Sequence, residues 1–127
     1  MAIKTIVVGT DLGESGRRAM QLAVHTARAT SATLWLVHAS EVGLEHGWRD
    51  LPLGARTAAH ALRQRLKGRF ENSLRELENE RKECEAAGLS AQTSCEEGQP
   101  WETILRTAVS VNADLIAVGD PVGAIGL

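Results

Sequence analysis

The chain has 127 residues, of which 43% are hydrophobic and 24% are charged, and its net charge is −2. These values are ordinary for one globular domain, residues 1–127, and the charge does not favour a nucleic-acid or membrane partner. With no tyrosine and a single phenylalanine, a base-stacking platform is not expected. No apolar run approaches the roughly 18 residues of a transmembrane helix, and the start lacks a signal-peptide pattern. We therefore expect a cytoplasmic protein.

The N-terminal part predicts a strand, a helix and a second strand. Residues 3–10 form an apolar strand that leads into a turn with Gly13 as a left-handed residue. Small apolar residues recur at helical spacing over residues 15–29, with Ser15 as the expected N-cap. Residues 32–39 give the second strand. The small residues predict a helix that lies close to the sheet.

The middle of the chain predicts a long loop and a long helix. Residues 41–56 contain three glycines and a proline, and a loop of this length usually has a function. Within it, Trp48 either covers a site or packs on the core. A helix is predicted over residues 57–87, ending at Gly88. Its apolar stripe, opposite a charged face expected to be solvated, comprises Leu62, Leu66, Phe70, Leu74, Leu77, Cys84 and Ala87.

The C-terminal part predicts strand, helix and strand. Residues 91–96 form a polar strand suited to a sheet edge, and Pro100 marks the start of a helix of about three turns. Residues 115–118 are the fourth strand, followed by a glycine-rich tail. Cys84 and Cys95 show no metal-ligand spacing, so we expect buried or half-buried thiols.

The alternation of strands and helices predicts an open parallel sheet with right-handed crossovers and helices on both faces. The polar third strand belongs at an edge and the two most apolar strands in the centre, which favours the strand order 3-2-1-4. The winding then reverses between the first and fourth strands. Asp11 and Gly119 follow these two strands, so both are expected at the edge where such sheets bind ligands.

Five segments together resemble the UspA-type universal stress protein family. They are Ile-Val-Val-Gly-Thr-Asp-Leu-Gly-Glu-Ser (6–15), Arg-Ala-Met (18–20), Leu-Val-His-Ala (36–39), Gly-Gln-Pro-Trp-Glu-Thr-Ile-Leu (98–105) and Ala-Asp-Leu-Ile-Ala-Val-Gly (113–119). Each segment alone is a weak signal, but all five occur in the family's order and spacing. The resemblance covers the whole chain.

The resemblance implies a Rossmann-like domain of the adenine nucleotide alpha hydrolase-like type, a homodimer, and a cytoplasmic role in stress response. Some members of the family bind ATP through a glycine-rich loop after the fourth strand. ATP, with Mg²⁺, is therefore the implied cofactor. By resemblance, Asp11 would contact the adenosine, the backbone of Ala39 the adenine edge, and Val118 and Gly119 would begin the phosphate loop. The alternative for Asp11 is a turn residue that hydrogen-bonds local amides. The full set of implied nucleotide-binding residues is Thr10, Asp11, Ala39, Val118, Gly119 and Gly123.

The tail departs from the family's pattern. One residue too many separates Gly119 from Gly123, Pro121 lacks an amide donor, and Asp120 adds negative charge where phosphate would lie. The family's distal glycine and Ser/Thr, its fourth helix and its fifth strand have no counterpart. Either the chain is a truncated form of a longer protein, or this member has a degenerate site. The exposed apolar fourth strand that results favours truncation.

No arrangement of residues predicts a catalytic site. His38 ends a strand and is expected to bond locally, and the other histidines show no metal-ligand spacing. No nucleophile elbow, Walker lysine or paired carboxylates are present. We expect no catalytic residues and no metal site, with at most slow ATP hydrolysis. The alternative function is an interaction or dimerisation module that binds no nucleotide.

Overall fold

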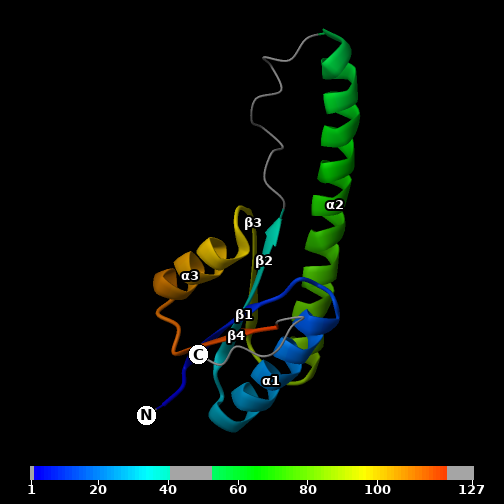
Figure 1. Ribbon diagram of the computed structural model, residues 1–127. Coiled ribbons are helices and arrows are strands. Elements are labelled where there is room, and N and C mark those ends of the chain that lie inside the picture. Colours follow the sequence, from blue (N-terminus) through cyan, green and yellow to red (C-terminus); the bar gives the residue numbers. More distant parts are fainter. Residues whose placement is uncertain (1, 41–52, 120–127) are drawn as a thin grey trace.

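The computed structural model describes residues 2–40 and 53–119. In that part the chain alternates strictly between strands and helices (Figure 1). The elements are β1 (Thr5–Gly9), α1 (Glu14–Thr30), β2 (Thr33–Ser40), α2 (Leu53–Ala86), β3 (Ala91–Glu97), α3 (Pro100–Ser110) and β4 (Leu115–Val118). Among the described residues, no helix has the length and apolar character needed to cross a bilayer.

The four strands form one parallel sheet in the order β3-β2-β1-β4, as the sequence predicts. Val8 of β1 lies between Leu36 of β2 and Ala117 of β4 in the register. The polar strand β3 occupies one edge, and β4 is the other edge among the described strands. The fold is therefore an open Rossmann-like sheet whose direction of winding reverses between β1 and β4.

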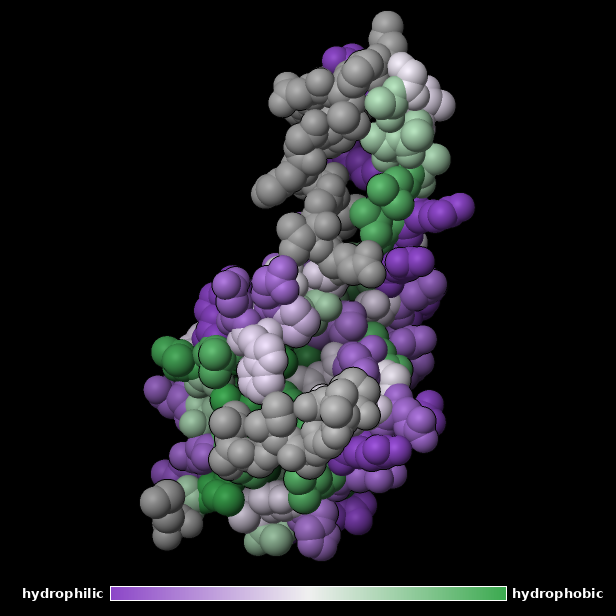
Figure 2. Space-filling view, viewed as in Figure 1, coloured by the Kyte–Doolittle hydropathy of each residue, from purple (hydrophilic) through white to green (hydrophobic). Residues whose placement is uncertain are grey.

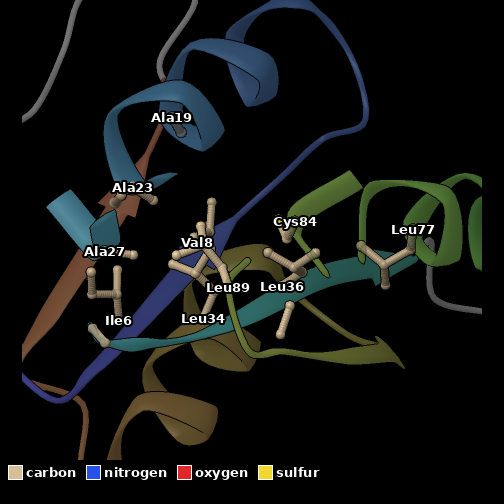
Figure 3. Packing of buried hydrophobic residues seen from close by; sticks show 13 residues of the cluster. Ile6, Val8, Ala19, Ala23, Ala27, Leu34, Leu36, Leu77, Cys84 and Leu89 are labelled. Atoms are coloured by element: carbon tan, nitrogen blue, oxygen red, sulfur yellow. The ribbon is translucent and has the colours of Figure 1, made fainter. Parts of the chain in front are cut away.

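One face of the sheet is covered by α1 and α2. Ile6, Val8, Leu34 and Leu36 are fully buried there and point toward both helices (Figure 3). The helix α1 contributes the buried residues Ala19, Ala23 and Ala27, and α2 contributes Leu77 and Cys84. Alanine side chains let α1 approach the sheet closely, and this confirms the small-residue face that the sequence indicates.

The opposite face is covered, within the described residues, by α3. Val7 and Val37 from the sheet pack against Ile104 and Ala108 of α3 in a second buried cluster. Gly9 lies beneath the same helix: a methyl group added there would come within 2.5 Å of the Ile104 side chain. A glycine at the end of β1 therefore allows α3 to lie close to the sheet.

The helix α2 extends well beyond the sheet that it covers (Figure 1). Its 34 residues begin at Leu53, so residues 53–56, predicted as loop, are helical. Of its apolar stripe, Leu77 is buried, whereas Leu62 and Leu74 are 55% and 43% exposed. Trp48 lies outside the described residues. Both cysteines are free, Cys84 buried and Cys95 half-buried, as predicted.

The start of α1 differs from the sequence prediction. Gly13 has an extended conformation with φ of −109°, and the left-handed residue is Leu12, with φ of 63°. The helix begins at Glu14 with Gly13 at the cap position, so Ser15 is not the N-cap. Both predictions are therefore wrong, because the carboxylate of Asp11 takes over the capping of this helix.

Candidate functional site

The carboxyl ends of β1, β2 and β4 surround a pocket of about 180 Å³. Its lining brings together segments that are far apart in the sequence: Gly9, Thr10, Asp11, Val37, His38, Ala39, Pro100, Trp101, Ile104, Val118 and Gly119. Five of the six residues that the sequence predicts for a nucleotide site are in this set. The sixth, Gly123, lies outside the described residues.

Asp11 organises the N-terminus of α1. Its Oδ1 accepts hydrogen bonds from the backbone amides of Gly13 (2.7 Å) and Gly16 (3.1 Å), and its Oδ2 accepts one from the Ser15 hydroxyl (2.7 Å). The Ser15 hydroxyl and these amides lower the pKa of Asp11 below its usual value. The carboxylate is thus ionised at neutral pH and rigidly placed, although the residue is exposed.

The capping by Asp11 requires glycine at position 16. A methyl group on Gly16 would lie 2.5 Å from Thr10 Oγ1 and 2.7 Å from Asp11 Oδ1. The third residue of α1 therefore approaches the end of β1 too closely for any side chain. This contact holds the Asp11 carboxylate between the strand and the helix.

Thr10 and His38 join the ends of β1 and β2. Thr10 donates its amide to the Val37 carbonyl (2.9 Å), and its buried hydroxyl accepts the Leu12 amide (3.0 Å). The Thr10 carbonyl lies 2.8 Å from Nδ1 of His38. Because a carbonyl oxygen can only accept, Nδ1 carries the proton. Both residues thus make local hydrogen bonds, as predicted for His38. These bonds hold the ends of β1 and β2 together where they line the pocket.

Gly119, which lines the pocket, lies against the first turn of α1. A methyl group on Gly119 would lie only 2.0 Å from the carbonyl oxygen of Ser15 and 2.4 Å from its carbonyl carbon. These are backbone atoms, so no rotamer change relieves the contact. The chain that leaves β4 therefore passes directly over the first turn of α1, and only glycine fits there.

Trp101 is one of six described lining residues that the sequence did not assign to the site, and it is the only aromatic one apart from His38. It lies in the first turn of α3, is 46% exposed, and presents an aromatic side chain to the pocket. Pro100 and Ile104 of the same helix also line it. The Gly-Gln-Pro-Trp segment signals a helix start directly after a parallel strand, and this signal could have placed Trp101 at the same sheet edge as Asp11.

The lining of the pocket is mostly apolar with a few oriented polar groups. Of the described lining residues, Asp11 carries the only carboxylate, and none is lysine or arginine. Binding sites commonly have such walls, although they usually enclose about 300 Å³ or more. Within residues 2–40 and 53–119, no cluster of three metal-ligating side chains is found. The pocket thus suits an uncharged, flat, hydrogen-bonding group better than an anion.

Two larger cavities, of about 340 and 370 Å³, lie between α1 and α2. Glu80 of α2 borders both, and its Oε2 is buried without a hydrogen-bond partner in the described part of the chain. Burial, with the neighbouring charges of Glu83 and Glu76, raises the pKa of Glu80 to about 7. These cavities hold none of the predicted nucleotide-binding residues.

Comparisons with known proteins agree with the fold. A sequence model of the universal stress protein family matches residues 2–122. No curated protein matches the chain. Among solved structures, universal stress protein UspA from Lactobacillus plantarum superposes with a TM-score of 0.68 at 18% identity, covering 100% of this chain and 81% of that one.

Two further similar structures contain nucleotides. A universal stress protein in complex with cAMP is 27% identical, with a TM-score of 0.58, and the match covers 93% of this chain and 73% of that one. A universal stress protein family protein from Arabidopsis thaliana with AMP bound is 18% identical, with a TM-score of 0.55, and the match covers 92% and 76% of the two chains.

Proposed function

Because this chain belongs to the universal stress protein family, we propose that it binds an adenine nucleotide at the carboxyl ends of β1, β2 and β4. The observation that carries this proposal is the pocket itself. Residues that the family resemblance assigns to nucleotide binding, including Asp11, Ala39 and Gly119, lie at or just after the ends of three strands and border one pocket. The similar structures with cAMP and AMP bound support an adenine nucleotide as the ligand.

The nucleoside part of the ligand fits the lining. The adenine ring would lie between the apolar walls, with its edge at the Ala39 backbone and one face near the exposed indole of Trp101. The Asp11 carboxylate accepts three hydrogen bonds and has about four acceptor positions. One position therefore stays open for a ribose hydroxyl, which would donate a hydrogen bond to this ionised and fixed carboxylate.

The phosphates contribute less than the nucleoside in this arrangement. The described lining holds no basic side chain, and Asp11 already occupies two amides at the N-terminus of α1. We therefore propose similar affinities for adenosine, AMP, cAMP and ATP, with Mg²⁺ held by the phosphates of ATP. We propose that the protein is dimeric and cytoplasmic and acts in the stress response. It would bind its nucleotide without hydrolysing it rapidly.

Calorimetric titration tests the proposal. Wild-type protein should bind adenosine, AMP and Mg-ATP at one site with dissociation constants within about tenfold of one another, a difference of about 1.4 kcal/mol. Ala39→Trp should remove the heat by filling the pocket, whereas Ala29→Trp, on an exposed position of α1, should leave it unchanged. Absence of heat with every ligand, or equal losses in both variants, contradicts the proposal.

A further inference from the structure

Another pocket, of about 210 Å³, lies between the end of β2 and α2. The last residues of the strand and a short stretch of the helix line this β2–α2 pocket: His38, Ala39, Ser40, Leu66, Arg69, Phe70 and Ser73. The helix extends beyond the sheet from here, and hydrophobic surface is visible over that part of α2 (Figure 2). The pocket is therefore a recess between a strand end and the apolar stripe of a helix.

The β2–α2 pocket is separate from the nucleotide pocket, although both border His38 and Ala39. The nucleotide pocket is walled by Pro100 and Trp101 of α3, whereas the β2–α2 pocket is walled by α2. These two helices cover opposite faces of the sheet. The two pockets thus lie on either side of the end of β2, and each can take a ligand of its own.

The helix side of the β2–α2 pocket offers one cation, a hydroxyl and apolar walls. The guanidinium of Arg69 has five N–H donors in a planar fork that matches a carboxylate. Ser73 follows Arg69 by one helical turn, as Phe70 follows Leu66. An aromatic wall such as Phe70 favours a planar ring. Because none of the described lining residues is acidic, the pocket favours an anion with an apolar body.

The strand side of the β2–α2 pocket adds an acceptor. Nδ1 of His38 donates to the Thr10 carbonyl at 2.8 Å, so Nε2 of the neutral ring can only accept a hydrogen bond. Within residues 2–40 and 53–119, Nε2 has no hydrogen-bond partner. A ligand hydroxyl supplies the missing donor, which a bare carboxylate does not.

We propose that the β2–α2 pocket is a second ligand site, which binds a small hydroxylated carboxylic acid with a planar apolar body. The carboxylate pairs with Arg69, and the hydroxyl donates to Nε2 of His38. The ring lies against Leu66 and Phe70.

The size of the β2–α2 pocket limits the ligand and its affinity. The volume of about 210 Å³ is that of about seven water molecules in the liquid, which suits a single ring. For a ligand of about ten non-hydrogen atoms, the dissociation constant should be on the order of 0.1–1 mM. The site needs no nucleotide, so it stands or fails independently of the proposed function.

Calorimetric titration of the whole chain with 4-hydroxybenzoate, without nucleotide, tests the proposal. Wild-type protein should bind it at one site, about three- to tenfold more tightly than benzoate, which lacks the hydroxyl. The neutral 4-hydroxybenzyl alcohol lacks the carboxylate and should bind at least about tenfold more weakly than the acid. Absence of heat with 4-hydroxybenzoate, or equal binding of the acid and the alcohol, overturns the proposal.

Substitutions test the two polar contacts. Arg69→Gln should weaken binding of 4-hydroxybenzoate at least about tenfold. Lys67→Gln removes the same charge from an exposed position of α2 outside the described lining and should leave binding unchanged. His38→Phe keeps a planar ring without the acceptor, so 4-hydroxybenzoate and benzoate should bind this variant equally. Circular dichroism confirms that each variant is folded. Equal effects of Arg69→Gln and Lys67→Gln, or an unchanged preference for the hydroxyl in His38→Phe, overturn the proposal.

Chemical shifts in ¹⁵N NMR spectra locate the bound acid. Titration with 4-hydroxybenzoate should shift the amides of Phe70 and Ser73 and leave the Trp101 indole unchanged. A shift at the Trp101 indole with none at Ser73 places the acid in the nucleotide pocket and overturns the proposal. A protein that fails to bind adenosine still gives the expected shifts, so the two proposals fail separately.

Discussion

Gly119 is the position where the geometry predicts the sharpest effect of a single methyl group. In Gly119→Ala the new Cβ would lie 2.0 Å from the Ser15 carbonyl oxygen and 2.4 Å from its carbon. Contacts of this kind normally need about 3.4 Å, so the end of β4 and the first turn of α1 must separate by more than an ångström. Overpacking of this size costs about 1–3 kcal/mol. The separation also opens the wall of the pocket, so adenosine affinity should fall with the stability.

Alanine substitutions at two other glycines provide controls for the loss of stability in Gly119→Ala. At Gly68, in the middle of α2, nothing lies within 4 Å of an added methyl group, so Gly68→Ala should stabilise the protein by about 0.5–1 kcal/mol. At Gly9 the contact is with the flexible end of Ile104, and Gly9→Ala should cost less than Gly119→Ala. Urea unfolding gives the three values. If Gly119→Ala is as stable as the wild type and binds adenosine equally well, the close contact with α1 is wrong.

Three further predictions concern Asp11, Glu80 and the core. Asp11→Ala should cost about 1–2 kcal/mol at neutral pH, the usual value of a lost helix cap. Because the pKa of Asp11 lies below its ordinary 3.8, its stabilisation is present above that pH and is lost as pH falls through the lower folded value; a loss unchanged at pH 2 would contradict this. The raised pKa of Glu80, about 7 against 4.5, acts in the opposite direction: stability falls as pH rises from 4.5 through 7, and Glu80→Gln should gain about 1 kcal/mol at pH 8 but nothing at pH 4. Urea titrations at several pH values measure both. Leu77→Ala should cost about 2–5 kcal/mol and Leu74→Ala less than about 1, since these residues of α2 are 1% and 43% exposed; equal losses would show that α2 does not pack as described.

The sheet could be predicted because its order follows from polarity. Gln92, Thr93 and Ser94 make β3 the polar strand, and a polar strand is stable only at an edge. The two apolar strands then have to be central, and right-handed crossovers leave one order. The same reasoning places Asp11 and Gly119 at one edge of the sheet, and both border the pocket.

The sequence-based predictions of local structure failed where two side chains compete for the same hydrogen bond or where a helix outlasts the sheet. Serine is a common N-cap residue, which is why the sequence favours Ser15. In the structure the Asp11 carboxylate accepts the Gly16 amide instead, and the Ser15 hydroxyl donates to Asp11. The apolar stripe of α2 reads as continuous, yet its 34 residues span about 51 Å, whereas the eight residues of β2 span about 26 Å. Leu62 is therefore exposed, and a helix pattern alone does not reveal where the sheet ends.

Trp101 shows that local sequence alone does not identify a pocket residue. Its sequence neighbourhood predicts the start of a helix, and only its place after a parallel strand indicates which end of the sheet that helix faces. The crossover from β3 brings it to the carboxyl edge, where it joins residues from β1, β2 and β4. The chemistry of the pocket thus depends on a residue whose role is set by topology.

The central claim is that the pocket at the ends of β1, β2 and β4 holds the nucleoside. Amide and indole chemical shifts in ¹⁵N NMR spectra, recorded during titration with adenosine, test it most directly. We expect shifts at Thr10, Ala39 and the Trp101 indole, with Met20 and Cys84 unchanged. Shifts that instead cluster at Met20 and Cys84, beside the larger cavities between α1 and α2, would contradict it.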